Sequence, residues 1–201
     1  MGSLDYKYSG EEHYKKLAKL KGFASRSVFK LIELDKKFKI LNENDIVLDL
    51  GYWPGGWIKY CAKKSKLCIG IDIKEIKEDL LKIKNIMLFK KDIFDENIFK
   101  YINNNSKILK FDVVLSDMMA NTTGQKDVDS YNSFLLSKRA LDFAITMLTH
   151  DGFFVCKIFH GEFFDEFLKE CRSNFANVKM SKPKSSRENS REVYVICKIK
   201  K

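Results

Sequence analysis

Lys157 is the residue whose surroundings in the sequence most strongly suggest chemistry. It lies within the run GFFVCKIF at 152–159, which is apolar enough to form a strand buried on both faces. A lysine is rarely found in such a strand. Removal from water lowers the pKa of a lysine amine, and so does a second cation nearby, so a buried lysine can act as a base. The alternative is a lysine that reaches out from the strand end and pairs with an acid.

Three aspartates follow predicted strands at the point where each strand ends. Asp72 comes roughly twenty residues after a glycine-rich turn, where a carboxylate can accept hydrogen bonds from both ribose hydroxyls of an adenosine. Asp92 follows the next strand and could meet the adenine amino group. Asp117 closes the strand at 111–116, in the region where α/β proteins bind their ligands. Each aspartate alone could equally cap a loop, but together they favour a cofactor that contains adenosine.

The glycine-rich turn has the sequence DLGYWPGGW at 49–57 and leads into a predicted helix. Its glycines, Gly51, Gly55 and Gly56, allow positive φ angles and let a ligand approach the backbone closely. The spacing is neither G-x-G-x-x-G nor a Walker loop, which argues against a nicotinamide-dependent oxidoreductase and against pyrophosphate binding. A cofactor without phosphates but with an amino-acid tail fits better, although such a turn can also bind nothing.

Apolar runs and amphipathic patterns alternate along the chain. A basic amphipathic helix is predicted at 11–21, and a second helix, capped by Ser25 or Ser27, extends to about residue 38. Short runs rich in Val, Ile and Phe predict strands at 46–50, 67–71, 86–89, 111–116 and 152–159. Helices are predicted between them at 56–64, 95–103, 130–148 and 162–173. This alternation indicates a parallel sheet covered by helices on both faces.

The C-terminal part breaks the alternation. Predicted strands at 177–181 and 191–200 have no helix between them, so they should pair antiparallel at or near an edge of the sheet. The predicted fold class is α/β, with a doubly wound, mostly parallel sheet and an antiparallel C-terminal strand. This layout resembles that of the Rossmann-like class I methyltransferases. We expect one domain over 1–201, with a helical extension at 1–40 and an α/β core at 41–201.

Charge and cysteine content restrict the partners and the compartment. The 201 residues include 37 basic and 27 acidic side chains, for a net charge of +10. This excess suggests a polyanionic partner, and the alternative is a lysine-rich solvated surface. Five scattered cysteines without a C-x-x-C pattern indicate a reducing compartment, and three histidines apart from them give no metal site. We expect neither a membrane span nor a signal peptide.

Five collinear stretches resemble the FtsJ family of RNA 2′-O-ribose methyltransferases, and most closely its ribosomal large-subunit branch. They are SRSVFKL at 25–31, DLGYWPGGW at 49–57, SDMMANTTG at 116–124, CKIFHG at 156–161 and PKSSRENSREVY at 183–194. The resemblance covers nearly the whole chain. Two departures are Tyr52-Trp53, where the family has small residues, and Ala120, where it has proline.

This resemblance implies S-adenosylmethionine as the methyl donor and a catalytic tetrad without a metal. The tetrad maps onto Lys30, Asp117, Lys157 and Glu192. The cofactor contacts are predicted at Gly51, Gly55, Gly56, Trp57, Asp72, Asp92 and Asp117. In the implied reaction Lys157 takes the proton of a ribose 2′-hydroxyl and Asp117 orients Lys157, while Lys30 and Glu192 position the ribose.

RNA is the expected partner, with the extension 1–40 facing it. Phosphate contacts are predicted at position 18 and Lys21 of the first helix, Arg26, Lys182, Lys184, Arg187 and Arg191. We expect a monomer that methylates the ribose of a uridine in large-subunit ribosomal RNA. Its compartment would be the cytoplasm, an organelle such as the mitochondrion, or the nucleolus. The alternatives are a tRNA or messenger-cap methyltransferase and a non-catalytic RNA-binding factor for ribosome assembly.

Overall fold

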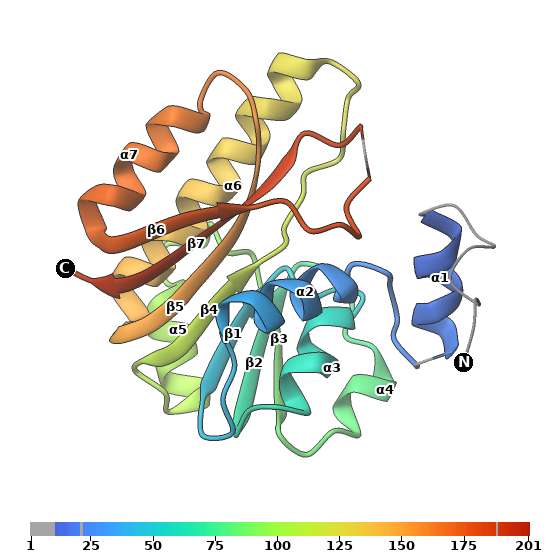
Figure 1. Cartoon of the computed structure of the whole chain (residues 1–201). Helices are drawn as coiled ribbons and strands as arrows, with labels where there is room; N and C mark the ends of the chain where they lie inside the picture. Colours follow the sequence, from blue (N-terminus) through green and yellow to red (C-terminus); the bar gives the residue numbers. More distant parts are fainter. Residues whose placement is uncertain (1–10, 21, 188) are drawn as a thin grey trace.

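The computed structural model describes residues 11–20, 22–187 and 189–201, which contain a mixed sheet (Figure 1). Its strands are β1 Ile46–Leu50, β2 Leu67–Asp72, β3 Ile86–Lys90, β4 Phe111–Ser116, β5 Leu148–Phe159, β6 Phe175–Ser181 and β7 Glu192–Lys200. Their order across the sheet is β3-β2-β1-β4-β5-β7-β6. The first five are parallel, and β7 runs antiparallel to its neighbours β5 and β6. The predicted fold class is confirmed. Of the two C-terminal strands, β6 lies at the edge of the sheet.

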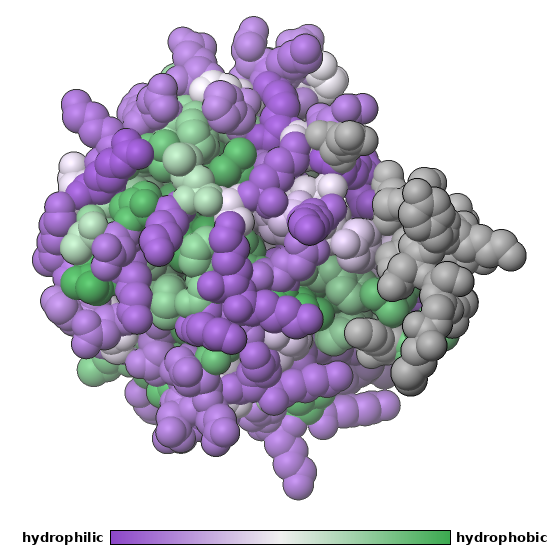
Figure 2. Space-filling view, viewed as in Figure 1, coloured by the Kyte–Doolittle hydropathy of each residue, from purple (hydrophilic) through white to green (hydrophobic). Residues whose placement is uncertain are grey.

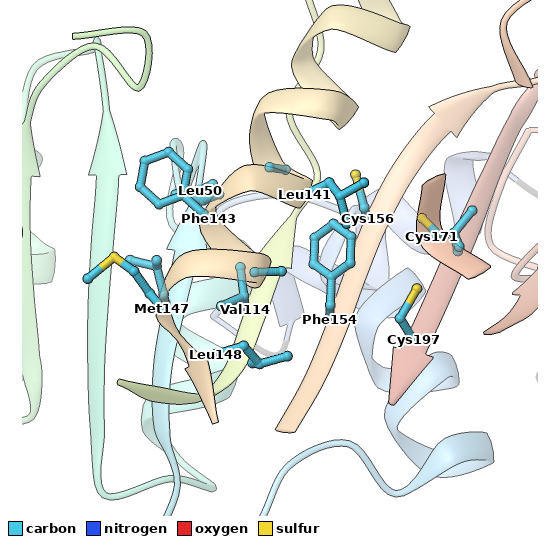
Figure 3. Packing of buried hydrophobic residues seen from close by; sticks show 14 of the residues in the cluster. Leu50, Val114, Leu141, Phe143, Met147, Leu148, Phe154, Cys156, Cys171 and Cys197 are labelled. Atoms are coloured by element: carbon cyan, nitrogen blue, oxygen red, sulfur yellow. The ribbon is translucent and has the colours of Figure 1, made fainter. Parts of the chain in front are cut away.

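Helices cover both faces of the sheet, as the alternating pattern predicted. The described helices are α1 Glu11–Leu20, α2 Val28–Phe38, α3 Gly56–Ala62, α4 Glu78–Leu81, α5 Ile98–Ser106, α6 Lys126–Met147 and α7 Phe164–Asn174. One hydrophobic core packs α5, α6 and α7 against the sheet through residues such as Phe143 and Phe167 (Figure 3). A second core packs α2, α3 and α4 through residues such as Leu31 and Ile58. The sheet is therefore buried between two helical layers.

The N-terminal helix α1 stands apart from both cores. Figure 1 shows it beside the N-terminal end of α2, at the side of the molecule. A small cluster formed by Ala18, Val28 and Phe29 joins the two helices. The amphipathic pattern therefore predicted the helix correctly, and its apolar side packs against α2 rather than against the sheet.

Element boundaries differ from the predictions where the sequence carries no distinct signal. β5 begins at Leu148 because this residue pairs with Phe111 ahead of an irregularity in the register. The short helix α4 was not predicted. Ser27 is the N-cap residue of α2, but its side chain makes no capping hydrogen bond, and its hydroxyl lies 2.7 Å from that of Ser25. The predicted cap position at Ser27 is therefore confirmed, although no side-chain capping bond forms.

In the described part of the chain, no helix is long and apolar enough to cross a membrane. The same residues contain no group of three or more His, Cys, Asp or Glu side chains that could hold a metal ion. All five cysteines are buried and free.

Candidate active site

A cleft of about 1010 Å³ opens at the carboxyl ends of the parallel strands. Doubly wound sheets bind ligands at this edge, where the strand order reverses, and here the reversal lies between β1 and β4. The whole predicted tetrad lines the cleft, together with part of the predicted cofactor set. These residues are Lys30, Asp117, Lys157, Glu192, Gly51, Asp72 and Asp92. The structure thus brings together residues that are up to 162 positions apart in the sequence.

Strand register brings Lys157 and Asp117 together. Ser116 at the end of β4 lies opposite Cys156 of β5, so the residues that follow meet at the cleft. The Lys157 Nζ lies 3.0 Å from Asp117 Oδ1 and donates a hydrogen bond of 2.7 Å to the Asp117 main-chain oxygen. Lys157 is 5% exposed. This lysine therefore lies in an ion pair and is not an isolated amine in an apolar strand.

Tyr194 is a residue of this site that the sequence analysis missed. It lies opposite Lys157 in the pairing of β5 with β7, and its hydroxyl donates a hydrogen bond of 2.6 Å to Asp117 Oδ1. Burial raises the pKa of Tyr194 and the charge of Asp117 raises it further, so the hydroxyl stays protonated and donates. A signal was available, because residues two apart in a strand share a face and Glu192 precedes Tyr194 by two.

Asp117 remains a carboxylate in spite of its burial. Burial acts to raise the pKa of Asp117, but the charges of Lys157 and Lys30 and the hydrogen bond from Tyr194 act against it and prevail. The pKa of Asp117 is therefore lower than its ordinary value. A negative charge is thus fixed beside the Lys157 amine throughout the neutral pH range.

Lys30 and Glu192 form a second ion pair at the same end of the cleft. The Lys30 Nζ lies 2.7 Å from Oε1 and 2.8 Å from Oε2 of Glu192. The Lys30 amine also lies 5.9 Å from the centre of the Tyr194 ring. Both side chains of the pair are largely buried. We call these two ion pairs, with Tyr194 between them, the tetrad end of the cleft.

Asp72 and Asp92 lie at the other end, which we call the aspartate end. Asp72 accepts hydrogen bonds from the main-chain N–H groups of Lys74, at 2.9 Å, and Trp53, at 3.0 Å. Asp92 accepts one from the N–H of Phe94 at 2.9 Å. Each carboxylate oxygen has further lone pairs, so both groups can accept hydrogen bonds from a ligand's hydroxyl or amino group in the cleft.

The aspartate end fits a cofactor that contains adenosine and an amino-acid tail. Ile73 and Phe94 line it with apolar surface although they are 61% and 51% exposed, which suits the face of a purine ring. Gly51 lines the adjoining part with a φ of 76°, and a Cβ at this position would clash with Met118. Carboxylates for hydroxyl and amino groups, apolar walls and a turn without a side chain are thus all present.

Gly55, Gly56 and Trp57 are not among the described residues that line the cleft. Trp57 is 3% exposed, its Nε1 donates a hydrogen bond of 2.9 Å to the Ser27 main-chain oxygen, and its ring stacks on Tyr194 at 5.8 Å. Gly55 is the N-cap residue of α3, with a φ of 107°. These contacts support a packing role for the three residues, and their direct contact with a cofactor stays a prediction.

The two large residues of the turn point in opposite directions. Tyr52 is 2% exposed, and its ring lies 2.7 Å from the position that a Cβ of Gly70 would occupy in β2. Trp53 is 46% exposed and lines the cleft, with the Lys77 amine 5.0 Å from its ring centre. The turn therefore accommodates both rings, since one fills the core and the other stands at the edge of the cleft.

Asp49, at the start of the turn motif, is a second residue that the sequence analysis did not single out. It is fully buried in β1, and neither of its carboxylate oxygens has a hydrogen-bond partner among the described residues. Burial raises the pKa of Asp49 well above its ordinary value, and the charges of Asp117 and Asp72 raise it further. The fold therefore favours the neutral form of this carboxyl group.

The predicted RNA contacts fall into two groups. Arg26 and Arg187 line the cleft, and Lys184 is exposed on the neighbouring loop. Lys182 and Arg191 each donate a hydrogen bond to a main-chain oxygen of the protein, at 2.7 and 3.2 Å. These bonds fix the loop before β7, so Lys182 and Arg191 have a structural role apart from any contact with RNA.

The prediction of a basic contact at position 18 is wrong. Ala18 occupies this position, is 3% exposed and packs against α2. Lys21 lies outside the described residues. Figure 2 shows hydrophilic side chains over most of the face that it presents.

Comparisons of the sequence with known proteins identify its family. A family model described as FtsJ-like methyltransferase matches residues 23–200. Two relatives are each named ribosomal RNA large subunit methyltransferase E. The one from Desulfatibacillum aliphaticivorans is 44% identical, over 94% of this chain and 91% of the relative. The one from Bdellovibrio bacteriovorus is 38% identical, over 96% of this chain and 99% of the relative.

Solved structures are similar as well. A protein from Plasmodium falciparum, provisionally described as a ribosomal RNA methyltransferase, has a TM-score of 0.77 and 28% identity, over 89% of this chain and 98% of its own. A protein from Streptococcus mutans in complex with SAH shares the fold, with a TM-score of 0.56 and 18% identity over 84% and 96%. FtsJ-like methyltransferases use S-adenosylmethionine. The match over residues 23–200 and the identity to full-length relatives show that this chain belongs to the FtsJ-like methyltransferase family.

Proposed function

We propose that this protein transfers a methyl group from S-adenosylmethionine to the 2′-oxygen of a ribose in RNA. The observation that carries the proposal is the cluster of Lys157, Asp117 and Tyr194 in the cleft whose other end presents Asp72 and Asp92. A ribose hydroxyl is a weak nucleophile near neutral pH, so it needs a proton acceptor and an aligned approach to the methyl carbon. A cleft with these two ends provides both.

The aspartate end binds the methyl donor. S-adenosylmethionine supplies a methyl group carried on a cationic sulfur. Asp72 accepts hydrogen bonds from the two ribose hydroxyls of the cofactor, and Asp92 accepts one from the adenine amino group. Gly51 leaves room for the amino-acid tail beside the turn. Asp117 lines the same cleft and would lie on the side of the tetrad end.

The tetrad end binds the ribose of the substrate and accepts its proton. Lys30 and Glu192 hold the ribose in line with the methyl carbon. The 2′-O–H bond would break and its proton would pass to the Nζ of Lys157. The oxygen would take the methyl group as the bond between that group and the sulfur breaks, so that the neutral thioether S-adenosylhomocysteine is the leaving group. Lys157 has to be neutral before this step in order to accept the proton. Asp117 orients the amine and stabilises the ammonium group that results.

We propose large-subunit ribosomal RNA as the substrate and a uridine as the methylated nucleotide. The relatives named for this RNA cover more than nine tenths of the chain and support the choice. The net charge of +10 and the position of Arg26 and Arg187 on the cleft suit a polyanion. We further propose a monomer that works in a reducing compartment, consistent with five free cysteines.

Two alternatives remain. One is methylation of a tRNA or of a messenger cap by the same chemistry, and the other is a non-catalytic role in ribosome assembly. The complete tetrad favours catalysis, because a factor that only binds RNA has no need of two buried ion pairs at the end of a cleft.

Mapping of ribose methylation in total RNA, from cells with and without the protein, tests the substrate. The expected result is the loss of one methylated position in large-subunit ribosomal RNA, whereas a lost position in tRNA or at a messenger cap would favour that alternative. A calorimetric titration with S-adenosylmethionine tests the enzyme against the binding factor. Failure to bind the cofactor would contradict the proposal.

A further inference from the structure

The loop that follows β3 forms one wall of the aspartate end. Asp92, Ile93 and Phe94 all line the cleft. The loop has its own short-range hydrogen bonds, from the N–H of Asp95 to the Asp92 main-chain oxygen at 3.2 Å and from the N–H of Phe94 to the Asp92 carboxylate at 2.9 Å. Such bonds give a loop its shape but do not fix its place relative to the rest of the molecule.

Arg139 of α6 supplies a link to the helical layer, beside the core packing of Ile93 and the hydrogen bond of 2.9 Å from the Lys91 N–H to the Asp72 main-chain oxygen. Its Nε donates a hydrogen bond of 2.7 Å to the Ile93 main-chain oxygen, and its Nη2 lies 3.5 Å from the Asp95 main-chain oxygen. Leu136, one turn earlier on α6, lines the cleft itself. The arginine therefore connects two main-chain groups of the loop to a helix that also forms part of the cleft wall.

The guanidinium group is itself firmly held. Its central carbon lies 5.1 Å from the ring centre of Phe99 and 5.3 Å from that of Phe143, and Nη1 lies 3.6 Å from Asp142. The side chain is 17% exposed. A planar group packed against two rings has few orientations available, so its donors are directed at the loop before any ligand arrives.

We propose that Arg139 is a positioning residue for the adenine end of the cofactor, acting through the loop that carries Asp92. This inference rests on the proposed function. A loop that is already in place loses little conformational entropy when a ligand binds, whereas a released loop has to be ordered at the expense of affinity. Arg139 touches neither reacting atoms nor the tetrad, so it affects cofactor affinity and leaves the chemical step unchanged.

The test compares Arg139→Met with Arg139→Lys and with the control Lys138→Met. Methionine keeps the apolar stem that packs against the rings but has no donors, and lysine restores one donor. Lys138 lies next to Arg139 on α6 but pairs with Glu170 at 2.7 Å and does not line the cleft. Its replacement by methionine therefore removes an ion pair from the same helix on the side away from the loop.

Calorimetry with S-adenosylhomocysteine and with S-inosylhomocysteine, which lacks the adenine amino group, gives the readout. We expect Arg139→Met to weaken binding of S-adenosylhomocysteine about tenfold, and to reduce the preference of the protein for the adenine form. Arg139→Lys should recover part of both, and Lys138→Met should change neither. In kinetic assays the KM for S-adenosylmethionine should rise, while kcat at saturation and the KM for RNA stay as in the wild type.

Equal affinities of the wild type and Arg139→Met for S-adenosylhomocysteine would overturn the inference. A fall in kcat at saturating cofactor without a rise in KM would also overturn it, because this would indicate a general structural role. Thermal unfolding would show whether Arg139→Met folds poorly. In that case the affinity of Arg139→Lys for S-adenosylhomocysteine decides, since it is expected to lie below that of the wild type. A wild-type protein that fails to bind S-adenosylhomocysteine would instead contradict the proposed function.

Discussion

The two ends of the cleft hold their carboxylates by different means. At the aspartate end, Asp72 and Asp92 accept hydrogen bonds from main-chain N–H groups two positions further along the chain. At the tetrad end, Asp117 and Glu192 pair with lysines that are 40 and 162 positions away. A local turn fixes a carboxylate without a cation and leaves it available to a ligand. A distant lysine can hold a carboxylate only after the whole sheet has assembled. Replacing such a lysine is therefore expected to change both the stability of the fold and the rate of methyl transfer.

The largest effect that separates the two ends is expected from Lys157→Arg. The arginine can keep the ion pair with Asp117, but a guanidinium group keeps its proton and cannot act as a base. Methyl transfer should fall by a factor of about 100 or more, while cofactor affinity stays unchanged. Single-turnover methylation assays and calorimetry measure the two quantities. Substantial methyltransferase activity in this variant would leave Lys157 as an electrostatic residue and remove the base from the mechanism.

Lys157→Ala serves as its companion. It removes one partner of the buried Asp117, whose carboxylate then depends on Lys30 and Tyr194 alone. The loss of a partner from a buried ion pair is costly, so the thermal midpoint should fall below that of Lys157→Arg. Equal midpoints for the two variants would show that the tetrad end does not couple stability to chemistry.

At the aspartate end the expected change is in affinity alone. Asp72→Ala should weaken cofactor binding by about 1 to 3 kcal/mol, since a charged acceptor for the ribose hydroxyls is lost. The kcat at saturating cofactor should remain within about twofold. Asp95→Ala is the matched control, because Asp95 also accepts a hydrogen bond from an N–H group two positions on, at 2.8 Å, but does not line the cleft. Unchanged affinity of Asp72→Ala would contradict the assignment.

Asp49 is a buried carboxyl group that has neither a main-chain N–H donor nor a lysine as partner among the described residues, so its effect on stability can be compared with that of the paired carboxylates. Its pKa is raised in the folded protein, so its contribution to stability is fully present at acidic pH and is lost as the pH rises. Asp49→Asn should therefore increase the free energy of unfolding at pH 7 by on the order of 1 kcal/mol. The gain should shrink as the pH falls towards 4. Urea unfolding at several pH values measures this dependence.

Asp35 provides a control with the opposite sign. It is 2% exposed, but Lys64, the N–H of Leu41 and Tyr60 act against the effect of burial and lower its pKa. Its contribution to stability is present at neutral pH and is lost as the pH falls through the folded pKa. Asp35→Asn should therefore destabilise the protein at pH 7, and less so in acid. If both variants changed stability in the same direction at pH 7, the distinction between paired and unpaired carboxyls would fail.

The smallest expected effect is on RNA affinity, and it concerns basic residues that belong to neither named end of the cleft. Replacement of Lys184 and Arg187 by alanine should flatten the dependence of RNA affinity on salt concentration, by about one unit of slope per lost phosphate contact. Lys66 and Lys84, which are exposed and precede β2 and β3 at the opposite edge of the sheet, give a control with the same change in charge. Equal slopes for the two double variants would place RNA elsewhere on the surface.

The difference between the two ends also explains how far the sequence alone could predict the site. Asp72 and Asp92 were predicted because each lies at or just after the end of a strand that the local sequence pattern reveals. Lys157 was singled out by its apolar strand, but its pairing with Asp117 depends on the register of β5 with β4, which local patterns do not specify. Tyr194 was missed although Glu192, two residues earlier on β7, was predicted. Its contact with Asp117 depends on the pairing of β7 with β5, which local patterns do not specify.

The fold shows the same division. Alternating apolar and amphipathic segments predicted the parallel sheet, its helical layers and the antiparallel pairing at the C-terminus. Short-range patterns did not predict α4, whose four residues are too few for a helical period to be recognised. The first residues of β5 were missed because they include polar side chains and belong to the strand only through pairing of Leu148 with Phe111.

The place of β7 in the sheet makes assembly of the tetrad end depend on a strand that follows β6 in the chain. Of the described strands, β7 comes last in the chain, yet it lies between β5 and β6, and β6 pairs with no other described strand. While the chain is being synthesised, β6 therefore emerges before the strand that attaches it, and the nascent chain folds from its N-terminal side. A ribosome that stops before Glu192 releases a chain with Asp72 and Asp92 but without Glu192 and Tyr194. Such a fragment lacks two residues of the tetrad end, so it cannot form the ion pair between Lys30 and Glu192.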